Sequence, residues 1–307
     1  MKNGLSIIIT YYFGSKYIME CINSIYKSYD TSLSKIQMEI ILVIDSPNDN
    51  SFDFNQLKNY YENKGNLKIL FNEKNIGVAK SRNLGLLNST KNHFTILDQD
   101  DFVDINYFKT IENEINNSNE DIYLLNGKYI FVNQKSAKMF YFSPKFTIKS
   151  ILMQYTNIIS PGLVIFNKKN IEIDNLFFET SPYYRGCDDW AAYINIILNV
   201  KNLKFKFINK VLFYYRFHEN NYGNNIKGMI YSTLSVIDYF SKQQTNNSLK
   251  VLKNARSRYY FLYLLKVKKH SLLKLFQYYP MYTFEHYFTS FFNIERFNSV
   301  IAKLTKR

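Results

Sequence analysis

The chain has 307 residues, of which 46% are hydrophobic and 18% aromatic, so it is typical of a globular protein and not of a disordered one. Its 39 basic and 25 acidic residues give a formal charge of +14, which favours an anionic partner such as nucleic acid, lipid or a phosphorylated small molecule. The chain shows no apolar run of membrane-spanning length, no signal-peptide cleavage pattern and no paired cysteines, so we expect a cytoplasmic protein.

The first hundred residues alternate between two patterns. Continuously apolar, β-branched stretches predict strands at 5–12, 38–46, 67–73 and 93–98. Apolar residues at helical spacing predict helices at 16–29, 54–65 and 77–90. Apolar strands that alternate with helices predict an α/β fold, in which a mostly parallel central sheet carries helices on both faces.

The second half of the chain is less regular. Strands are expected at 121–133, 138–146, 160–168 and 203–218, and helices at 147–156 and 187–201. We therefore expect an α/β domain over 1–227 and a helical, basic and aromatic region over 228–307, with one long helix at 248–276. That region can lie on an anionic membrane surface, or it can pack on the α/β domain or on another copy.

Acidic residues gather where the predicted strands end. Because ligands of parallel sheets bind at the carboxyl ends of the strands, Asp45 and the cluster Asp98, Asp100 and Asp101 are expected at one edge. Helix capping accounts for one carboxylate per helix, not for three in four positions. Since like charges repel unless a cation lies among them, and Asp98 and Asp100 can face the same side, the cluster predicts a site for Mg²⁺ or Mn²⁺.

Six segments in this order and spacing resemble the family 2 glycosyltransferases, which have a GT-A fold. The resemblance covers roughly residues 5–220 and rests on SIIITYY, EIILVIDS, NEKNIGVAKSRNLGL, ILDQDD, GCDDW and YYRFHENN. It implies inverting transfer of a hexose or N-acetylhexosamine from a nucleotide sugar, UDP-linked, to a hydroxyl of a glycan or lipid-linked glycan. The donor would bind the part at about 1–104 and the acceptor the part at about 105–227. Such bacterial enzymes build surface polysaccharides such as lipopolysaccharide or capsule, and this one would work in the cytoplasm, peripherally on the inner face of the membrane.

The resemblance also assigns the metal site. Asp98 would lie near the ribose and the metal, Asp100 would be the principal metal ligand, and His218 would complete the metal shell. A lone histidine is otherwise more often structural. Asp101 is expected only to cap the helix that begins near Ile105.

The remaining donor contacts fall on four segments of the chain. Asp45 would receive the uracil or ribose, although Ile44 replaces the acid that usually precedes it. Thr10 and Tyr12 would flank the base, with ordinary packing as the alternative for Tyr12. The residues implied around the diphosphate are Gly77, Lys80, Arg82, Asn83 and Arg216. A solvated basic helix face is the alternative for the two cations at 80 and 82.

The segment GCDDW supplies the implied catalytic base. Inverting transfer needs a carboxylate to take the proton of the attacking hydroxyl, and the motif places it at Asp189, with Asp188 orienting either Asp189 or an acceptor hydroxyl. The alternative for both acids is compensation of the helix dipole at the start of the 187–201 helix.

Two rival functions follow from the same sequence. A basic nucleic-acid-binding protein would explain the charge, but the acids at the strand ends would repel phosphates, so no nucleic-acid partner is expected. A phosphatase of the haloacid dehalogenase type would use an Asp-x-Asp after a strand, but that motif usually opens the chain and here begins at residue 98.

Overall fold

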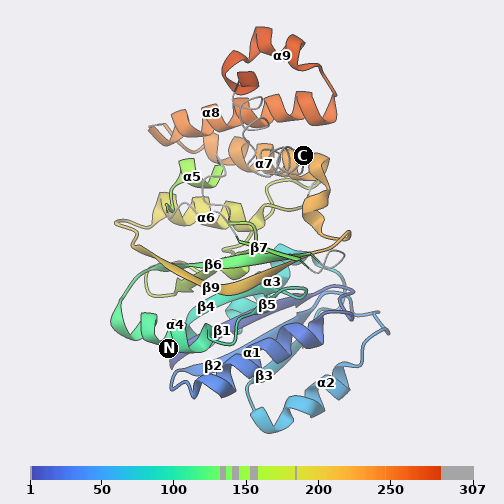
Figure 1. The fold of residues 1–307 in the computed structure, drawn as a ribbon, viewed down its shortest axis with the longest axis vertical. Coiled ribbons are helices and arrows are strands. Elements are labelled where there is room, and N and C mark those ends of the chain that lie inside the picture. The colour runs from blue at the N-terminus through green and yellow to red at the C-terminus, as the bar shows by residue number, and fades with distance from the viewer. Residues whose placement is uncertain are drawn as a thin grey trace, which may run out of the picture. The chain divides into compact units, whose positions relative to one another are not determined.

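The computed structural model describes residues 2–131, 136–139, 145–152, 158–183, 185–245 and 247–284. The chain forms two compact units (Figure 1). The first unit comprises Met1–Thr180 and Gly186–Asn224, and the second comprises Ser181–Arg185 and Asn225–Arg307.

The first unit is built on one mixed sheet. Its described strands are β1 (Lys2–Tyr11), β2 (Gln37–Ile44), β3 (Leu67–Phe71), β4 (Lys91–Asp98), β5 (Phe102–Val103), β6 (Ile122–Phe131), β7 (Ser136–Met139), β8 (Val164–Asn167) and β9 (Phe205–Phe217). Their order is β3-β2-β1-β4-β8-β6-β9-β5, with β7 paired to β6. The first four strands are parallel, whereas β8 is antiparallel to both β4 and β6, and β9 is parallel to β6. The α/β fold is therefore confirmed, with the parallel arrangement concentrated in the amino-terminal half.

Helices of the first unit follow the predicted segments closely. They are α1 (Ile18–Ser32), α2 (Phe54–Tyr61), α3 (Val78–Leu87), α4 (Tyr107–Asn117), α5 (Ile148–Leu152) and α6 (Asp188–Asn199), with 3-10 turns at Glu62–Lys64, Pro161–Leu163 and Tyr222–Asn224. Helix α3 packs on β1 and β2, and α1 packs beside α4 (Figure 1). Part of the predicted strand 138–146 and of the predicted helix 147–156 lies outside the described residues.

The second unit is helical, as the sequence predicts for this region. Its described helices are α7 (Ile226–Ser241), α8 (Asn247–Leu262) and α9 (Leu272–Tyr278). The expected single helix at 248–276 is wrong, because a π-helical segment at Tyr263–Val267 and the left-handed Lys269 end it. Ser271 then caps α9 by accepting a hydrogen bond from the backbone of Lys274. Within the described part of the chain, none of the helices is both long enough and apolar enough to cross a membrane.

A close contact in the core involves Gly85 of α3. A Cβ atom at Gly85 would lie 2.4 Å from Cγ2 of Ile8 and 3.3 Å from Cγ2 of Val43, on β1 and β2. Both strand residues are fully buried. The glycine thus lets the helix approach the parallel strands that end at the acidic cluster.

We expect Gly85→Ala to lower the free energy of unfolding by about 1–3 kcal/mol, because the added methyl group overpacks this contact. Alanine is intrinsically favoured over glycine in a helix by about 1 kcal/mol, so a loss would show that packing dominates. Chemical denaturation measures the change. Gly223→Ala is the control, since no atom other than those of Gly223 and its two chain neighbours lies within 4 Å of the added Cβ. An equal loss in both variants would contradict the packing argument.

Candidate active site

The carboxyl ends of β1, β2 and β4 meet at one edge of the sheet. Thr10 pairs in register with Asp98, and Tyr11 pairs with Ile44. The backbone N–H of Asp45 donates to the carbonyl of Tyr11 at 2.8 Å. The predicted convergence of the strand ends is therefore confirmed.

Asp45 shapes the loop that leads into α3. The side chain is buried and accepts hydrogen bonds from the backbone N–H of Ile76 at 2.8 Å and of Gly77 at 3.0 Å, and from Nδ2 of Asn72 at 2.8 Å. Gly77 is the N-cap residue of α3, with φ of 90°, a conformation that favours glycine. Both oxygens of Asp45 are thus engaged within the protein, which argues against the predicted direct contact with the base or ribose.

Arg82 is the cation at the centre of the acidic cluster. Its Nη2 lies 2.8 Å from Oδ1 of Asp98, and its Nη1 lies 2.7 Å from Oδ2 of Asp188 at the start of α6. Arg82 is 6% exposed. Burial alone would lower the pKa of Arg82, but the two carboxylates raise it above its ordinary value, so the residue stays charged. Arg82 therefore joins α3, β4 and α6, and is not free to meet a diphosphate.

Asp189 lies next to this ion-paired group. The N-cap residue of α6 is Cys187, in the left-handed conformation, so neither acid is the N-cap. Oδ1 of Asp189 accepts a hydrogen bond from the backbone N–H of Trp190 at 2.8 Å, and Oδ2 has no partner among the described residues. Burial and the neighbouring Asp188 raise the pKa of Asp189 to about 7, against the lowering effect of Arg82. A carboxylate of this kind can accept a proton near neutral pH.

Asp100 and His218 form a second pair just beyond the end of β4. Oδ2 of Asp100 lies 2.8 Å from Nε2 of His218, and the imidazole stacks on the ring of Tyr17 at 5.1 Å. Both residues of the pair face a cavity of about 380 Å³. Its lining is Tyr12, Phe13, Gly14, Lys16, Tyr17, Gln99, Asp100, His218, Glu219 and Asn220.

This pair fits a divalent cation that is completed by substrate. Among the described residues, no group of three or more His, Cys, Asp or Glu side chains could hold a metal ion. Mg²⁺ commonly binds one or two carboxylates and takes its other ligands from phosphates and water, which the open cavity leaves room for. The structure brings Asp100 and His218 together as predicted, whereas Asp98 is turned toward Arg82 and Ser160.

Asp101 is not a helix cap, so that prediction is wrong. Its carboxylate is fully buried and accepts hydrogen bonds from the backbone N–H of Arg216 at 2.9 Å and from Oγ of Ser160 at 3.1 Å. Helix α4 begins at Tyr107, and it is Asp104 that accepts from the backbone N–H of Asn106. Asp101 therefore ties β9 to the end of β4, because a buried carboxylate needs such donors.

Two other predicted diphosphate ligands are occupied within the protein. Arg216 donates from Nε to the carbonyl of Asp100 at 2.7 Å and pairs with Glu20 at 2.8 Å. Asn83 exchanges two hydrogen bonds with the backbone of Phe177, at 2.6 Å and 3.0 Å. Both arrangements argue against direct roles in nucleotide binding. Lys80 is exposed.

Of the two residues predicted to flank the base, Tyr12 lines the cavity and Thr10 does not. Tyr12 is 53% exposed and lines the cavity, and its backbone is held on both sides by the side-chain amide of Gln99 at 2.9 Å and 3.0 Å. Sequence reasoning missed Gln99 and also Ser160, which links Asp98 to Asp101. The serine before Pro161 is a recognisable cap of the 3-10 turn, but nothing in the local sequence shows that it meets β4.

The fold and the acidic strand ends define a glycosyltransferase of the GT-A class. The fold is similar to that of Staphylococcus aureus TarS residues 1–349, in a crystal structure in complex with UDP-GlcNAc. The match covers 87% of this chain and 73% of the TarS chain, with a TM-score of 0.63 and 19% sequence identity. A mannosyltransferase from Pyrobaculum calidifontis, in complex with GDP-Man and Mn²⁺, gives a TM-score of 0.56 at 14% identity, covering 84% of this chain and 70% of that one.

The profile described as Glycosyl transferase family 2 matches residues 6–173, and the chain belongs to this family. Glycosyltransferase GlyG of Streptococcus pneumoniae is 23% identical over 282 residues, which are 89% of this chain and 90% of GlyG. The protein is thus a glycosyltransferase, and neither a nucleic-acid-binding module nor a dehalogenase-type phosphatase has support.

Proposed function

We propose that this glycosyltransferase transfers a sugar with inversion from a UDP-linked donor, a hexose or N-acetylhexosamine, to a hydroxyl of a glycan or lipid-linked glycan. The observation that carries the proposal is that the acidic residues at the end of β4 form two separate groups with different partners. Arg82 pairs with Asp98 and with Asp188, next to Asp189, while Asp100 pairs with His218 at the cavity. The UDP-GlcNAc bound by TarS supports the donor class.

The donor half of the proposal concerns about residues 1–104 together with the His218 segment. Asp100 and His218 would hold Mn²⁺ or Mg²⁺, which when bound neutralises the diphosphate and stabilises it as a leaving group. Tyr12 presents an exposed ring for the base, and Lys16 adds a positive charge to the same cavity. The Mn²⁺ bound by the mannosyltransferase supports this choice of metal.

The acceptor half, within about residues 105–227, provides the base. Asp189 would take the proton of the acceptor hydroxyl as that oxygen attacks the anomeric carbon in line with the departing diphosphate. Asp188 pairs with Arg82 and orients the first turn of α6. A carboxyl group with a pKa of about 7 is suited to this exchange.

Synthesis of a bacterial surface polysaccharide on a lipid-linked acceptor is the setting that we propose. Residues 228–307 would then meet the anionic inner face of the membrane or a second copy of the chain. The exposed Leu273 and Phe276 of α9 and the exposed Lys274 between them support a surface contact. Co-sedimentation with anionic vesicles measures it, and an absence of binding would remove the membrane from the proposal.

Asp100→Asn is expected to reduce Mn²⁺-stimulated hydrolysis and transfer of the donor sugar by at least about 100-fold, because metal stabilisation of the transition state is worth several kcal/mol. Initial rates with UDP-GlcNAc across a Mn²⁺ titration, with and without chelator, measure the effect. Asp174→Asn is the matched control, since Asp174 is exposed and lies outside the cavity and the acidic cluster. Undiminished metal stimulation in Asp100→Asn would refute the metal site.

A further inference from the structure

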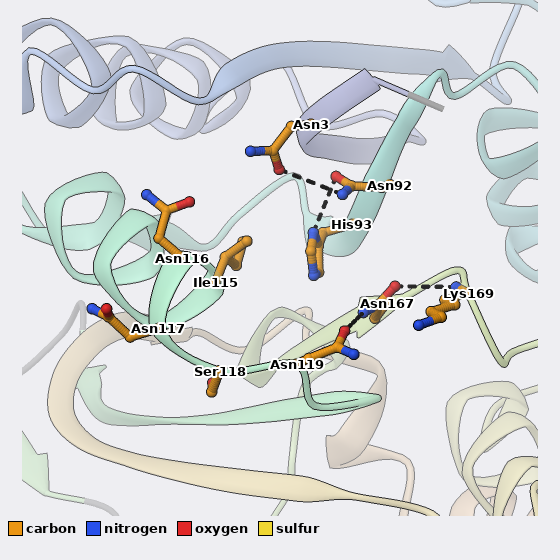
Figure 2. Close-up of a pocket in the computed structure, with 10 residues that line it drawn as sticks. All are labelled: Asn3, Asn92, His93, Ile115, Asn116, Asn117, Ser118, Asn119, Asn167 and Lys169. Atoms are coloured by element: carbon orange, nitrogen blue, oxygen red, sulfur yellow. Dashed lines mark hydrogen bonds between the residues drawn. The ribbon is translucent and has the colours of Figure 1, made fainter.

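A second cavity lies at the opposite edge of the sheet from the acidic cluster. It measures about 780 Å³ and opens beside the first residues of β4, the end of α4 and the end of β8 (Figure 2). His93 in its wall precedes Asp98 by five residues along β4, so the two edges are roughly 16 Å apart at 3.3 Å per residue. The cavity is therefore separate from the proposed donor and acceptor site.

Amide side chains dominate the lining of this second cavity. Six of its residues are asparagines, namely Asn3, Asn92, Asn116, Asn117, Asn119 and Asn167. Lys169 is the single charged residue among those that line it. An amide both donates and accepts hydrogen bonds, so such a wall is suited to a neutral ligand with many hydroxyl groups.

Internal hydrogen bonds hold part of this wall in place. Oδ1 of Asn92 accepts from the backbone N–H of Gly4 at 2.9 Å, which fixes the orientation of the amide. Nδ2 of Asn167 lies 3.4 Å from Oδ1 of Asn119, and Oδ1 of Asn167 accepts from the backbone of Lys169 at 3.1 Å. Asn116 is exposed, and its side chain makes no hydrogen bond with the described residues, so its donors and acceptor are available.

His93 supplies the observation that points to a ligand. The side chain is 4% exposed, and Figure 2 shows its ring directed into the cavity from β4. Nδ1 lies 3.1 Å from Oδ1 of Asn92, which can only accept, so Nδ1 carries the proton. Burial lowers the pKa of His93 to about 4, against the raising effect of a hydrogen bond with the backbone of Gly4, and the ring is neutral. Nε2 is then a lone-pair acceptor, and it has no partner among the described residues.

We propose that this cavity is a second, non-catalytic binding site for a neutral saccharide segment, with a sugar hydroxyl donating to Nε2 of His93 and the asparagine amides contacting neighbouring hydroxyls. The choice of a saccharide, rather than another polyol, rests on the proposed function, because the acceptor and product proposed for this enzyme are saccharides. A site on the far edge of the sheet would hold a distal part of a long glycan while its end reacts elsewhere.

The test uses the full chain labelled with ¹⁵N at asparagine and no nucleotide sugar. Neutral tetrasaccharides of glucose, galactose or N-acetylglucosamine are added, with inorganic phosphate as a separate arm. We expect at least one tetrasaccharide to shift the side-chain amide signals of Asn116 and Asn119 saturably, and phosphate to leave them unchanged. The proposal is overturned if no tetrasaccharide shifts them, or if phosphate alone does so.

Substitutions of His93 and Asn116 test whether these two side chains contact the saccharide. His93→Phe should weaken the saccharide about tenfold, since a lost hydrogen bond to a buried acceptor is worth about 1–1.5 kcal/mol. Should that buried substitution impair folding, Asn116→Ala, on an exposed position, should still weaken binding by about threefold or more. Asn55→Ala is the matched control, because Asn55 is an exposed helical asparagine outside both cavities. Equal binding by Asn116→Ala, His93→Phe and the control would overturn the assignment.

Failure of the second saccharide site can be distinguished from failure of the proposed function. Transfer to a short acceptor that cannot reach both edges should proceed at the wild-type rate in Asn116→Ala. Lost transfer in Asp100→Asn with intact tetrasaccharide binding supports both sites as independent. Saccharide binding that disappears in Asp100→Asn would place it at the acidic cluster and refute the second site.

Discussion

Asp189→Asn is expected to lower kcat for sugar transfer by about 10²–10⁴-fold, the usual contribution of a positioned general base. The amide keeps the shape of the side chain and its hydrogen bond with the backbone of Trp190, but it cannot take a proton. Binding of the donor should change little, because the donor is expected at the Asp100 cavity. Transfer rates and donor titrations on the same preparations measure the two quantities separately.

The pH profile tests whether the lost group is the titrating one. Since the base must be ionised to act, kcat/KM of the unmodified enzyme should rise with pH and level off above about 7, the raised pKa of Asp189. The residual activity of Asp189→Asn should lack this limb, whereas the exposed Asp174→Asn should keep both rate and profile. A variant that transfers sugar normally, or that keeps the same limb, would exclude Asp189 as the base.

Arg82→Met should lower the free energy of unfolding by about 3 kcal/mol and abolish transfer. The substitution leaves Asp188, whose side chain is 5% exposed, without a partner, and uncompensated buried charges are costly. The cost falls at the lower end of the usual range because Asp98 is 29% exposed and keeps access to water. Denaturant titration measures the stability, and the activity assay measures the loss of alignment at α6.

A second-site change separates the charge effect from lost packing. Arg82→Met combined with Asp188→Asn removes the unpaired charge and should recover part of the stability but not the activity. The control is Lys64→Met, which breaks the exposed pair with Asp30, and exposed pairs contribute about 0–1 kcal/mol. If Arg82→Met costs no more than Lys64→Met, the buried bridge does not stabilise the fold.

The sequence predicts most of the amino-terminal half because local patterns determine it. The helices α1 and α3 and the strands from β1 to β4 all have strong apolar periodicity or continuity, and each lies within a few residues of its predicted bounds. The convergence of Asp45 and Asp98 follows from parallel strands alone. The antiparallel entry of β8 between β4 and β6 depends on long-range pairing, which no local pattern encodes.

The partners of the charged residues could not be predicted in the same way. Arg82 lies 106 positions from Asp188, so only tertiary structure shows that this cation is already neutralised. Asp101 has the local appearance of a cap, but burial against β9 gives it backbone and hydroxyl donors instead. In contrast, the pairing of Asp100 with His218 was anticipated by family resemblance, because both positions belong to recurring motifs.

The two partners of Arg82 are synthesised at different times on the ribosome, because they lie at different distances from it along the chain. Amino-terminal segments emerge and begin to fold first, so Arg82 and Asp98 can pair as soon as α3 and β4 exist. Asp188 follows Arg82 by 106 residues, and His218 follows Asp100 by 118. A chain released before α6 would therefore retain the parallel strands but lack both Asp189 and His218. With the roles proposed for these two residues, a prematurely terminated chain is expected to show neither sugar transfer nor hydrolysis of the donor.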